Sequence, residues 1–116
     1  MLQDMYRLNQ PKPDIRFNRN GIIYIIDQAA QRMNIGPLSR VSFYVDQEQN
    51  LFIRPDTDGL RPIISRGKKT LRIYSKQVTD AVLSLPDLPQ GLEQASFRIG
   101  TSDDGINYPV ITRRLL

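Results

Sequence analysis

The chain has 116 residues, of which 40% are hydrophobic, and it contains neither cysteine nor histidine. This composition predicts one small domain with a compact core. The missing residue types exclude disulfides and thiolate chemistry and remove the commonest general base. We therefore expect a cytoplasmic protein that is not an enzyme and holds no cofactor or metal. No apolar run approaches the ~20 residues that span a bilayer, so no membrane partner is expected.

The formal net charge of +4 is unevenly distributed. Residues 1–60 carry equal numbers of basic and acidic side chains, and residues 61–116 carry the whole excess. Between Gly59 and Thr79 there are six basic residues and no acidic one. Most of the basic residues are arginines, whose planar fork of donors suits phosphates and carboxylates. This pattern is typical either of a solvated face that maintains solubility or of an anion-binding surface.

The first half predicts a strand–helix–strand–strand unit after an irregular arm at 1–14. Two β-rich runs, 15–17 and 22–26, flank Asn18-Arg19-Asn20-Gly21 and predict a hairpin. Asp27 is the expected N-cap of a short helix that ends at Gly36-Pro37. Strands are predicted at 41–45, with alternating buried residues, and at 51–54, joined by the polar turn 46–50. Residues 55–59 form a predicted loop.

The second half repeats this order. Residues 62–64 lead into a turn at 65–68, and a strand follows at 70–74. Ser75 is the second expected N-cap, and Val78, Ala81, Val82 and Leu85 form an apolar helical stripe that Pro86 ends. Strands are predicted at 95–99 and 108–112, with a turn at 101–105 between them. Pro109 indicates that the last strand lies at a sheet edge, since proline cannot donate to a ladder on both sides.

The two halves align with length differences confined to loops. Ile25 and Ile73 match at an offset of 48 residues, Phe43 and Phe97 at 54, and Ile53 and Ile111 at 58. Insertions confined to loops are expected after duplication. The sequence therefore predicts a mainly β protein with two short helices (α+β). Its single domain, residues 15–116, is expected to contain two tandem copies at 15–55 and 61–114 that together form one small β-barrel about a pseudo-twofold axis.

The first copy resembles the half-barrel unit of AbrB/MraZ-type swapped-hairpin β-barrel proteins. The similarity rests on Gly21-Ile22-Ile23-Tyr24-Ile25, Ala29-Ala30, Met33-Asn34-Ile35 and Arg40-Val41-Ser42-Phe43. The chain departs from the family pattern where Ile22 replaces the usual arginine, Ile26-Asp27 the usual Ile-Pro, and Ser39-Arg40 the usual Gly-Asp. It is also similar to small uncharacterised proteins of phages and mobile elements. The resemblance implies DNA binding, as in transcription factors and antitoxins.

These patterns favour a small nucleic-acid-binding module, with DNA as the expected partner. The candidate binding residues are basic and lie in or beside the two hairpins: Arg16, Arg19, Arg61, Arg66, Lys68, Lys69, Arg72 and Lys76. Two basic turns on one side of a barrel would contact phosphates across a groove. One alternative is a protein-interaction or assembly module of phage or mobile-element origin, structural or host-inhibitory, in which the edge strand recruits another chain and a homo-oligomer is one such assembly. Another is a barrel that sequesters an anionic ligand such as a nucleotide.

The remaining polar and aromatic residues have structural interpretations. The strand tyrosines (Tyr24, Tyr44, Tyr74 and Tyr108) are expected to pack at the edge of the core with the hydroxyl in water. Asp103-Asp104-Gly105 is typical of a hairpin turn. The acidic residues are spread through turns, and Asp56-x-Asp58-Gly59 lacks the later glutamate of a calcium loop, so no catalytic or metal site is predicted.

Overall fold

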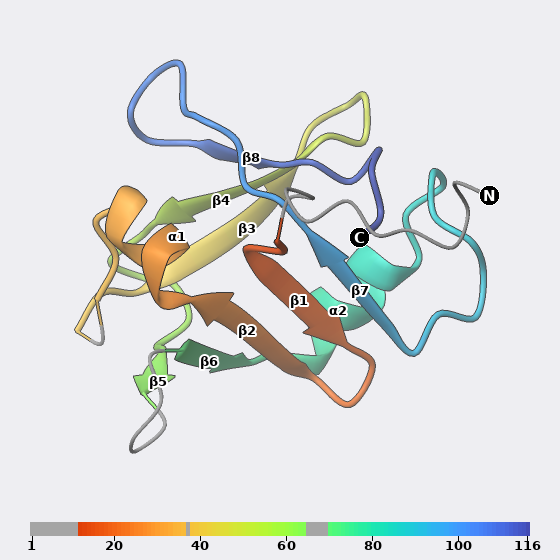
Figure 1. Ribbon diagram of the computed structural model, residues 1–116, viewed down its shortest axis with the longest axis horizontal. Helices are drawn as coiled ribbons and strands as arrows, with labels where there is room; N and C mark the ends of the chain where they lie inside the picture. The colour runs from red at the N-terminus through yellow and green to blue at the C-terminus, as the bar shows by residue number, and fades with distance from the viewer. Residues whose placement is uncertain (1–11, 37, 65–69) are drawn as a thin grey trace, which may run out of the picture.

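The computed structural model describes residues 12–36, 38–64 and 70–116. Along these residues the order strand, strand, helix, strand, strand occurs twice (Figure 1). The elements are β1 (Ile15–Asn18), β2 (Ile22–Ile26), α1 (Asp27–Arg32), β3 (Val41–Val45), β4 (Leu51–Pro55), β5 (Ile63–Ile64), β6 (Thr70–Tyr74), α2 (Lys76–Leu83), β7 (Gln94–Phe97) and β8 (Tyr108–Val110). The predicted mainly β protein with two short helices is confirmed.

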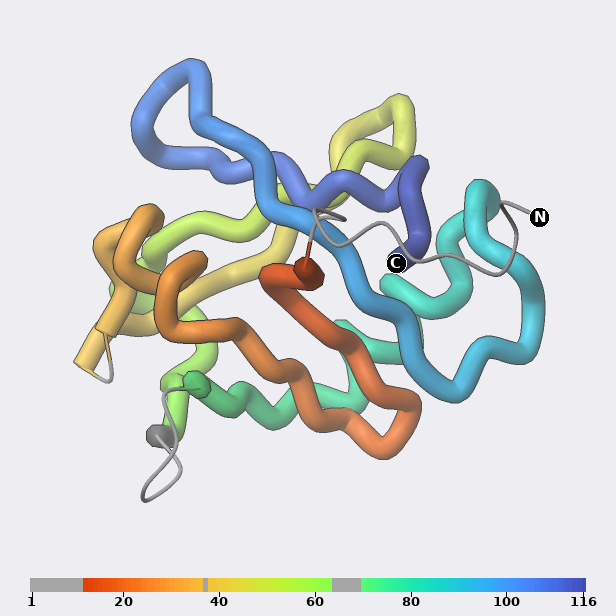
Figure 2. The backbone as a smooth tube through the Cα atoms, viewed as in Figure 1, coloured from red at the N-terminus to blue at the C-terminus, as the bar shows by residue number. Residues whose placement is uncertain are grey.

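The strands form two antiparallel sheets. A five-stranded sheet has the order β5-β6-β2-β1-β7, and a three-stranded sheet has the order β3-β4-β8. Figure 2 shows β4 and β8 side by side although they are far apart along the chain, and Leu51 pairs with Val110 there. Among the described residues the strand pairing does not close into a barrel, so the barrel stays a prediction.

The core lies between the two sheets and beneath α2. Phe17 of β1 contacts Phe43 of β3 with ring centroids 5.7 Å apart, and it contacts Phe97 of β7 at 6.1 Å. Along β2 the completely buried Ile23 and Ile25 alternate with partly exposed neighbours. Such alternation is expected where one sheet face is buried and the other faces solvent. The helix α2 packs behind β1 and β2 (Figure 1).

The first predicted hairpin is confirmed. In β1 and β2, Ile15 pairs with Ile25 and Phe17 with Ile23. The turn closes through a hydrogen bond from Gly21 N to Asn18 O at 2.9 Å. Gly21 has a backbone φ of +100°, which residues other than glycine rarely adopt. This explains the glycine at this position.

The N-cap prediction is right for one helix and wrong for the other. Ser75 Oγ accepts from Val78 N at 3.1 Å at the start of α2. In α1 the N-cap is Ile26, with no side-chain bond, and Asp27 is already the first helical residue. Because β2 runs directly into the helix, the Asp27 carboxylate lies along its side and accepts from Gln31 Nε2 at 3.1 Å.

The predicted helix end and apolar stripe also need correction. The helix α1 ends before Gly36: Asn34 has φ of +55°, and Ile35 N donates to Ala30 O at 2.8 Å. This is a Schellman-type termination, in which asparagine is one of the residues that tolerate the left-handed conformation. In α2, Ala81 is exposed and Thr79 is fully buried. Burial of Thr79 is tolerated because its hydroxyl donates to the backbone oxygen of Lys76 at 3.1 Å.

The second half follows the predicted strands with shifted bounds. The strand β7 begins one residue earlier and ends two residues earlier than expected, and Ile99 forms an isolated bridge to Val110. As Pro109 predicts, β8 is an edge strand of its sheet. None of the helices of the described residues is both long and apolar enough to cross a membrane.

Candidate functional site

The solvent-facing side of the five-stranded sheet carries a row of arginine, tyrosine and arginine. Because Phe17, Ile23 and Ile73 point into the core, their strand neighbours face outward. Arg16 of β1 lies opposite Tyr24 of β2, and Tyr24 lies opposite Arg72 of β6. We call Arg16, Tyr24 and Arg72 the arginine–tyrosine row. Neighbouring strands are about 4.8 Å apart, so the row crosses about 10 Å of the sheet.

Both arginines of the row lie near tyrosine rings. Arg16 Cζ is 5.7 Å from the centre of the Tyr24 ring, and Arg72 Cζ is 5.9 Å from that of Tyr74. Arg72 Nε is buried and has no hydrogen-bond partner among residues 12–36, 38–64 and 70–116. A buried donor without a partner is costly, because it has lost its water and gained nothing. Arg72 is therefore suited to an acceptor that arrives with a ligand.

The row borders an open groove of about 440 Å³. Its lining residues come mainly from β1, the first hairpin turn, β2 and β6: Pro13, Asp14, Ile15, Arg16, Asn18, Asn20, Tyr24, Ile26, Thr70 and Arg72. The lining thus combines guanidinium groups, amide groups, a hydroxyl and an aromatic ring. These groups match the donors and stacking surfaces that phosphates, sugars and bases require.

A buried carboxylate organises the neighbouring part of this face. The Asp14 side chain is 2% exposed; its Oδ2 accepts from Ile99 N at 2.8 Å and forms an ion pair with Arg32 Nη2 at 2.9 Å. Arg98 Nη1 lies 3.5 Å from Asp14 Oδ1. Sequence reasoning placed Asp14 at the end of the arm and missed this cluster. No sequence signal indicates it, because the partners come from distant parts of the chain.

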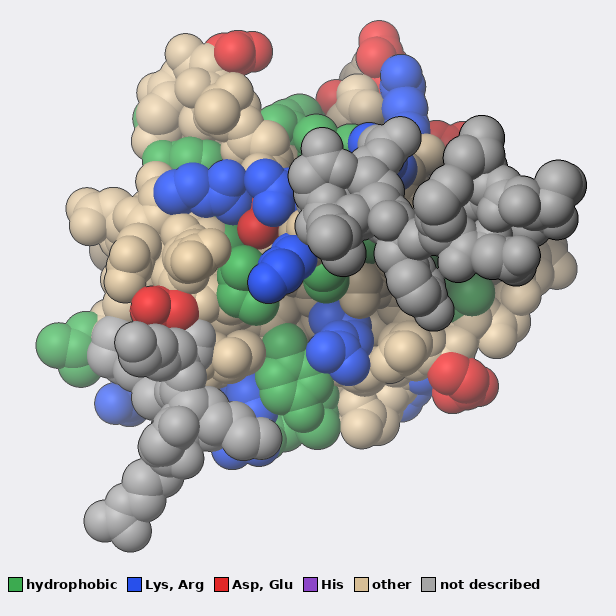
Figure 3. Space-filling model, viewed as in Figure 1, with side chains coloured by type: hydrophobic (Ala, Val, Ile, Leu, Met, Phe, Trp, Pro, Cys, Tyr) green, Lys and Arg blue, Asp and Glu red, His purple; other side chains and the backbone are tan. Residues whose placement is uncertain are grey.

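Basic side chains dominate this side of the molecule. Figure 3 shows Lys and Arg side chains gathered across the middle of the face, over β1, β2 and β7, with most acidic groups nearer the rim. Two hollows share Asp14 in their lining: Arg16 and Arg72 line the groove described above, and Arg32 and Arg98 line the neighbouring one. Because one carboxylate stands among four arginines, the face keeps an excess of positive charge.

Of the eight predicted binding residues, the structure brings Arg16 and Arg72 together at the groove. Arg61 is exposed just before β5. Arg66, Lys68 and Lys69 lie outside the described residues, and so does the turn at 65–68. The predicted pairing of the two basic turns at Arg19 and Arg66 is therefore not tested.

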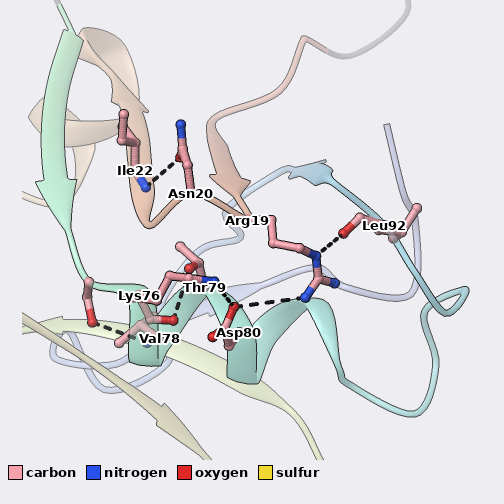
Figure 4. Close-up of polar contacts among 9 residues, drawn as sticks. Arg19, Asn20, Ile22, Lys76, Val78, Thr79, Asp80 and Leu92 are labelled. Carbon is pink, nitrogen blue, oxygen red and sulfur yellow. Dashed lines mark hydrogen bonds and ion pairs between the residues drawn. The ribbon is translucent and has the colours of Figure 1, made fainter.

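Arg19 and Lys76 lie at the hairpin-turn end of β1 and β2, where they make contacts within the protein (Figure 4). Arg19 Nε donates to Leu92 O at 2.8 Å, and Arg19 Nη1 lies 3.9 Å from Asp80 Oδ1. Lys76 Nζ lies 2.9 Å from the same oxygen of Asp80. Arg19 thus ties the first hairpin to α2, whereas Lys76 pairs with Asp80 within α2. The two cations share one carboxylate, which gives both of them a structural role.

The tyrosine prediction holds in part. Tyr108 packs against the core, as expected. Tyr24 and Tyr74 instead lie on the outer face of the sheet, and Tyr74 is 49% exposed. Tyr44 also faces outward on the other sheet, with Arg54 Cζ 4.1 Å from its ring centre. The alternation of β2 and β6 could have indicated this, because Tyr24 and Tyr74 are out of phase with the buried isoleucines.

The aspartates in turns stabilise the turns. Asp104 Oδ1 accepts from Ile106 N and Asn107 N, each at 2.8 Å, and these bonds hold the pKa of Asp104 well below its ordinary value. A bond from Asn50 N lowers the pKa of Asp46 in the same way. Asp103-Asp104-Gly105 lies in a bend between β7 and β8, but these strands belong to different sheets and, in the described part of the chain, are joined only by the Ile99–Val110 bridge, so the predicted hairpin turn is found in part. Among residues 12–36, 38–64 and 70–116, no three carboxylates gather as a metal ion would require.

Comparisons of the chain with protein-family models, with curated proteins and with solved structures find no match.

Proposed function

We propose that the protein is a small nucleic-acid-binding module, most simply a DNA-binding regulator, that contacts phosphates through Arg16 and Arg72. The observation that carries the proposal is the arginine–tyrosine row. At one end of the row lies the buried Nε of Arg72, for which the described part of the chain offers no hydrogen-bond partner. Arginine is favoured for phosphate recognition because its fork of donors matches the phosphate oxygens.

The ion pairs separate these two arginines from the others on the face. Arg32 and Arg98 contact Asp14, and Arg19 contacts Asp80. No ion pair joins Arg16 or Arg72 to a carboxylate of the described residues. A cation that already has an intramolecular partner gives up that contact when it binds a phosphate. Arg16 and Arg72 lose no such contact, which favours them as the binding residues.

Fluorescence anisotropy with a labelled oligonucleotide at low and moderate salt tests the proposal. We expect binding that weakens steeply with salt, because phosphate contacts release counterions. The double variant Arg16→Ala/Arg72→Ala should weaken binding and reduce the log–log salt slope by about 2. The matched control is Arg40→Ala/Arg113→Ala, which removes two exposed positive charges elsewhere. Thermal melting confirms that both variants are folded.

Three outcomes would contradict the proposal. The first is no binding at low salt, and the second is an equal loss in the control variant, which would indicate a general effect of net charge. The third is a rise in melting temperature with free nucleotides, lost in Arg16→Ala/Arg72→Ala, without binding of oligonucleotides. That result would favour sequestration of a small anionic ligand.

We also propose that the fold arose by duplication and has the swapped-hairpin arrangement. Two strand registers support this. At the centre of the β2–β6 pairing, Tyr24 lies opposite Arg72, 48 residues later, and 48 is the offset between the halves at these strands. In the β4–β8 pairing the offset between the halves is 58, so Leu51 is equivalent to Pro109 and Phe52 to Val110. The pair Leu51–Val110 is therefore the symmetry equivalent of the pair Phe52–Pro109.

A twofold axis between equivalent strands requires strand registers of this kind. Equivalent residues of the two copies must lie opposite one another where the axis crosses a pair of strands. The β3–β4 hairpin of the first copy thus pairs with β8 of the second, as a swapped hairpin would. Superposition of residues 15–55 on 61–114 in an experimental structure tests the proposal. An alignment that does not place Tyr24 on Arg72 would contradict it.

A further inference from the structure

We infer that the arginine–tyrosine row binds single-stranded rather than duplex nucleic acid, with one base stacked on Tyr24 and a neighbouring base on Tyr74. The inference rests on the proposed nucleic-acid binding and specifies its substrate class. Aromatic rings on a protein surface stack on unpaired bases of any sequence. In a duplex the base faces are covered by neighbouring bases, so such rings have nothing to stack on.

The position of Tyr24 makes it a fixed platform. Its strand, β2, is hydrogen-bonded to β1 on one side and to β6 on the other. Ile23 and Ile25, on either side of Tyr24 in the sequence, are completely buried. A ring held on such a strand loses little conformational freedom when a base stacks on it, because the backbone is already ordered. The Arg16 guanidinium near this ring adds a second plane on which a base can stack.

Tyr74 supplies a second platform next to the first. It lies opposite Ile22, so it is diagonal to Tyr24 across the β2–β6 pair, and diagonal neighbours are about 7–8 Å apart. Tyr74 is 49% exposed, which leaves room for a base. Arg72 is directly opposite Tyr24 and two residues before Tyr74, and its Cζ lies 5.9 Å from the centre of the Tyr74 ring. A phosphate that joins two stacked bases would reach Arg72.

The groove also offers hydrogen bonds of the kind that single strands use. Asn20 Oδ1 accepts from Ile22 N at 3.1 Å, and in Figure 4 the amide nitrogen of Asn20 points away from Ile22. This nitrogen can donate to a base edge or a sugar oxygen. The volume of about 440 Å³ is within the range of pockets for small ligands. A groove of this size accommodates a base with its sugar rather than the side of a double helix.

The test compares three labelled oligonucleotides of equal length: oligo-dT, oligo-rU and a DNA duplex. Binding is followed by anisotropy and by quenching of tyrosine fluorescence, because the chain has five tyrosines and no tryptophan. At least one single strand should bind about tenfold more tightly than the duplex. Tyr24→Leu should weaken the binding of that single strand by about 5- to 150-fold, as expected for the loss of one stacked base. Tyr74→Leu should weaken it in the same direction.

Two control variants make the test specific. Tyr24→Phe keeps the ring and should keep the affinity, which separates stacking from loss of the hydroxyl. Tyr44→Leu removes a 39% exposed ring from the outer face of the other sheet and should have no effect. Thermal melting of each variant confirms the fold, and Tyr24→Phe keeps the comparison informative if Tyr24→Leu is unstable.

The outcomes separate the inference from the proposed function. If the duplex binds as tightly as either single strand, and the binding depends on Arg16 and Arg72, the proposed function stands and the inference is wrong. Equal affinities of Tyr24→Leu and Tyr44→Leu for single strands would also refute the inference. If no oligonucleotide binds at low salt, both fail.

Discussion

Replacing Asp14 by alanine removes a buried acidic side chain that ties the start of β1, α1 and the end of β7 together. Its carboxylate accepts from Ile99 N at 2.8 Å and forms ion pairs with Arg32 Nη2 at 2.9 Å and with Arg98 Nη1 at 3.5 Å. We expect Asp14→Ala to lower the free energy of unfolding by about 3 kcal/mol. The variant should still fold, because domains of this size have stabilities of about 5–15 kcal/mol.

Two losses contribute to this magnitude. Ile99 is only 4% exposed, and a buried N–H that loses its acceptor costs about 1–3 kcal/mol. The ion pairs with Arg32 and Arg98 are lost as well. Because these arginine side chains are 49% and 39% exposed, each pair contributes nearer to the ~0.2–1 kcal/mol of a surface pair than to the several kcal/mol of a buried one.

Urea denaturation followed by far-UV circular dichroism and tyrosine fluorescence measures the effect. Asp14→Asn is the informative companion, since its Oδ1 can still accept from Ile99 N although the charge is gone. It should cost about half as much as Asp14→Ala. Asp58→Ala, which removes an exposed carboxylate, is the matched control and should stay within about 0.5 kcal/mol of the parent protein.

A double-mutant cycle with Arg32→Ala isolates the ion pair, and the coupling energy should be about 0.5–1 kcal/mol. The reasoning is refuted if Asp14→Ala is no more destabilising than Asp58→Ala. It is also refuted if Asp14→Asn costs as much as Asp14→Ala, because the backbone acceptor would then contribute nothing.

Two further predictions concern the helix cap and the acidic turn. Ser75→Ala should lower the free energy of unfolding, measured by urea denaturation, by about 1 kcal/mol because Val78 N loses its capping oxygen. Ser84→Ala, at the exposed end of the same helix, is the control and should have little effect. The lowered pKa of Asp104 means that its ionised form stabilises the fold above about pH 4 and that this contribution is lost as the pH falls through the folded-state pKa. The difference in melting temperature between the parent protein and Asp104→Asn should therefore narrow as the pH is lowered below about 4. A difference that stays constant with pH would contradict the stabilising role of the ionised Asp104.

Local patterns predicted most elements because they depend on neighbours in the sequence. The hairpin at Gly21 and the cap at Ser75 were both predictable, since a turn and a cap are formed by residues a few positions apart. Asp27 has the same chemistry as a cap, but the direct passage from β2 into α1 gave the cap position to Ile26. The tolerance of Asn34 for a left-handed backbone likewise ended α1 before Gly36.

The candidate site was predicted in part. Arg16 and Arg72 were expected as binding residues from charge alone, and both lie at the groove. Charge could not distinguish them from Arg19, whose guanidinium bonds to Leu92 O and lies 3.9 Å from Asp80. Tyr24 was expected to pack at the core edge, although it stands between the two arginines. Which cation is free and which is paired depends on contacts between distant residues.

The sequence by itself determined the order of strands and helices, because hydrophobic periodicity and turn residues act locally. Only the tertiary structure decided which strands are neighbours. The pairing of β2 with β6 placed Tyr24 opposite Arg72, and the pairing of β1 with β7 brought Asp14 near Arg98. These contacts form when long loops close around a shared core. A local sequence pattern does not indicate which distant residues such closure brings together.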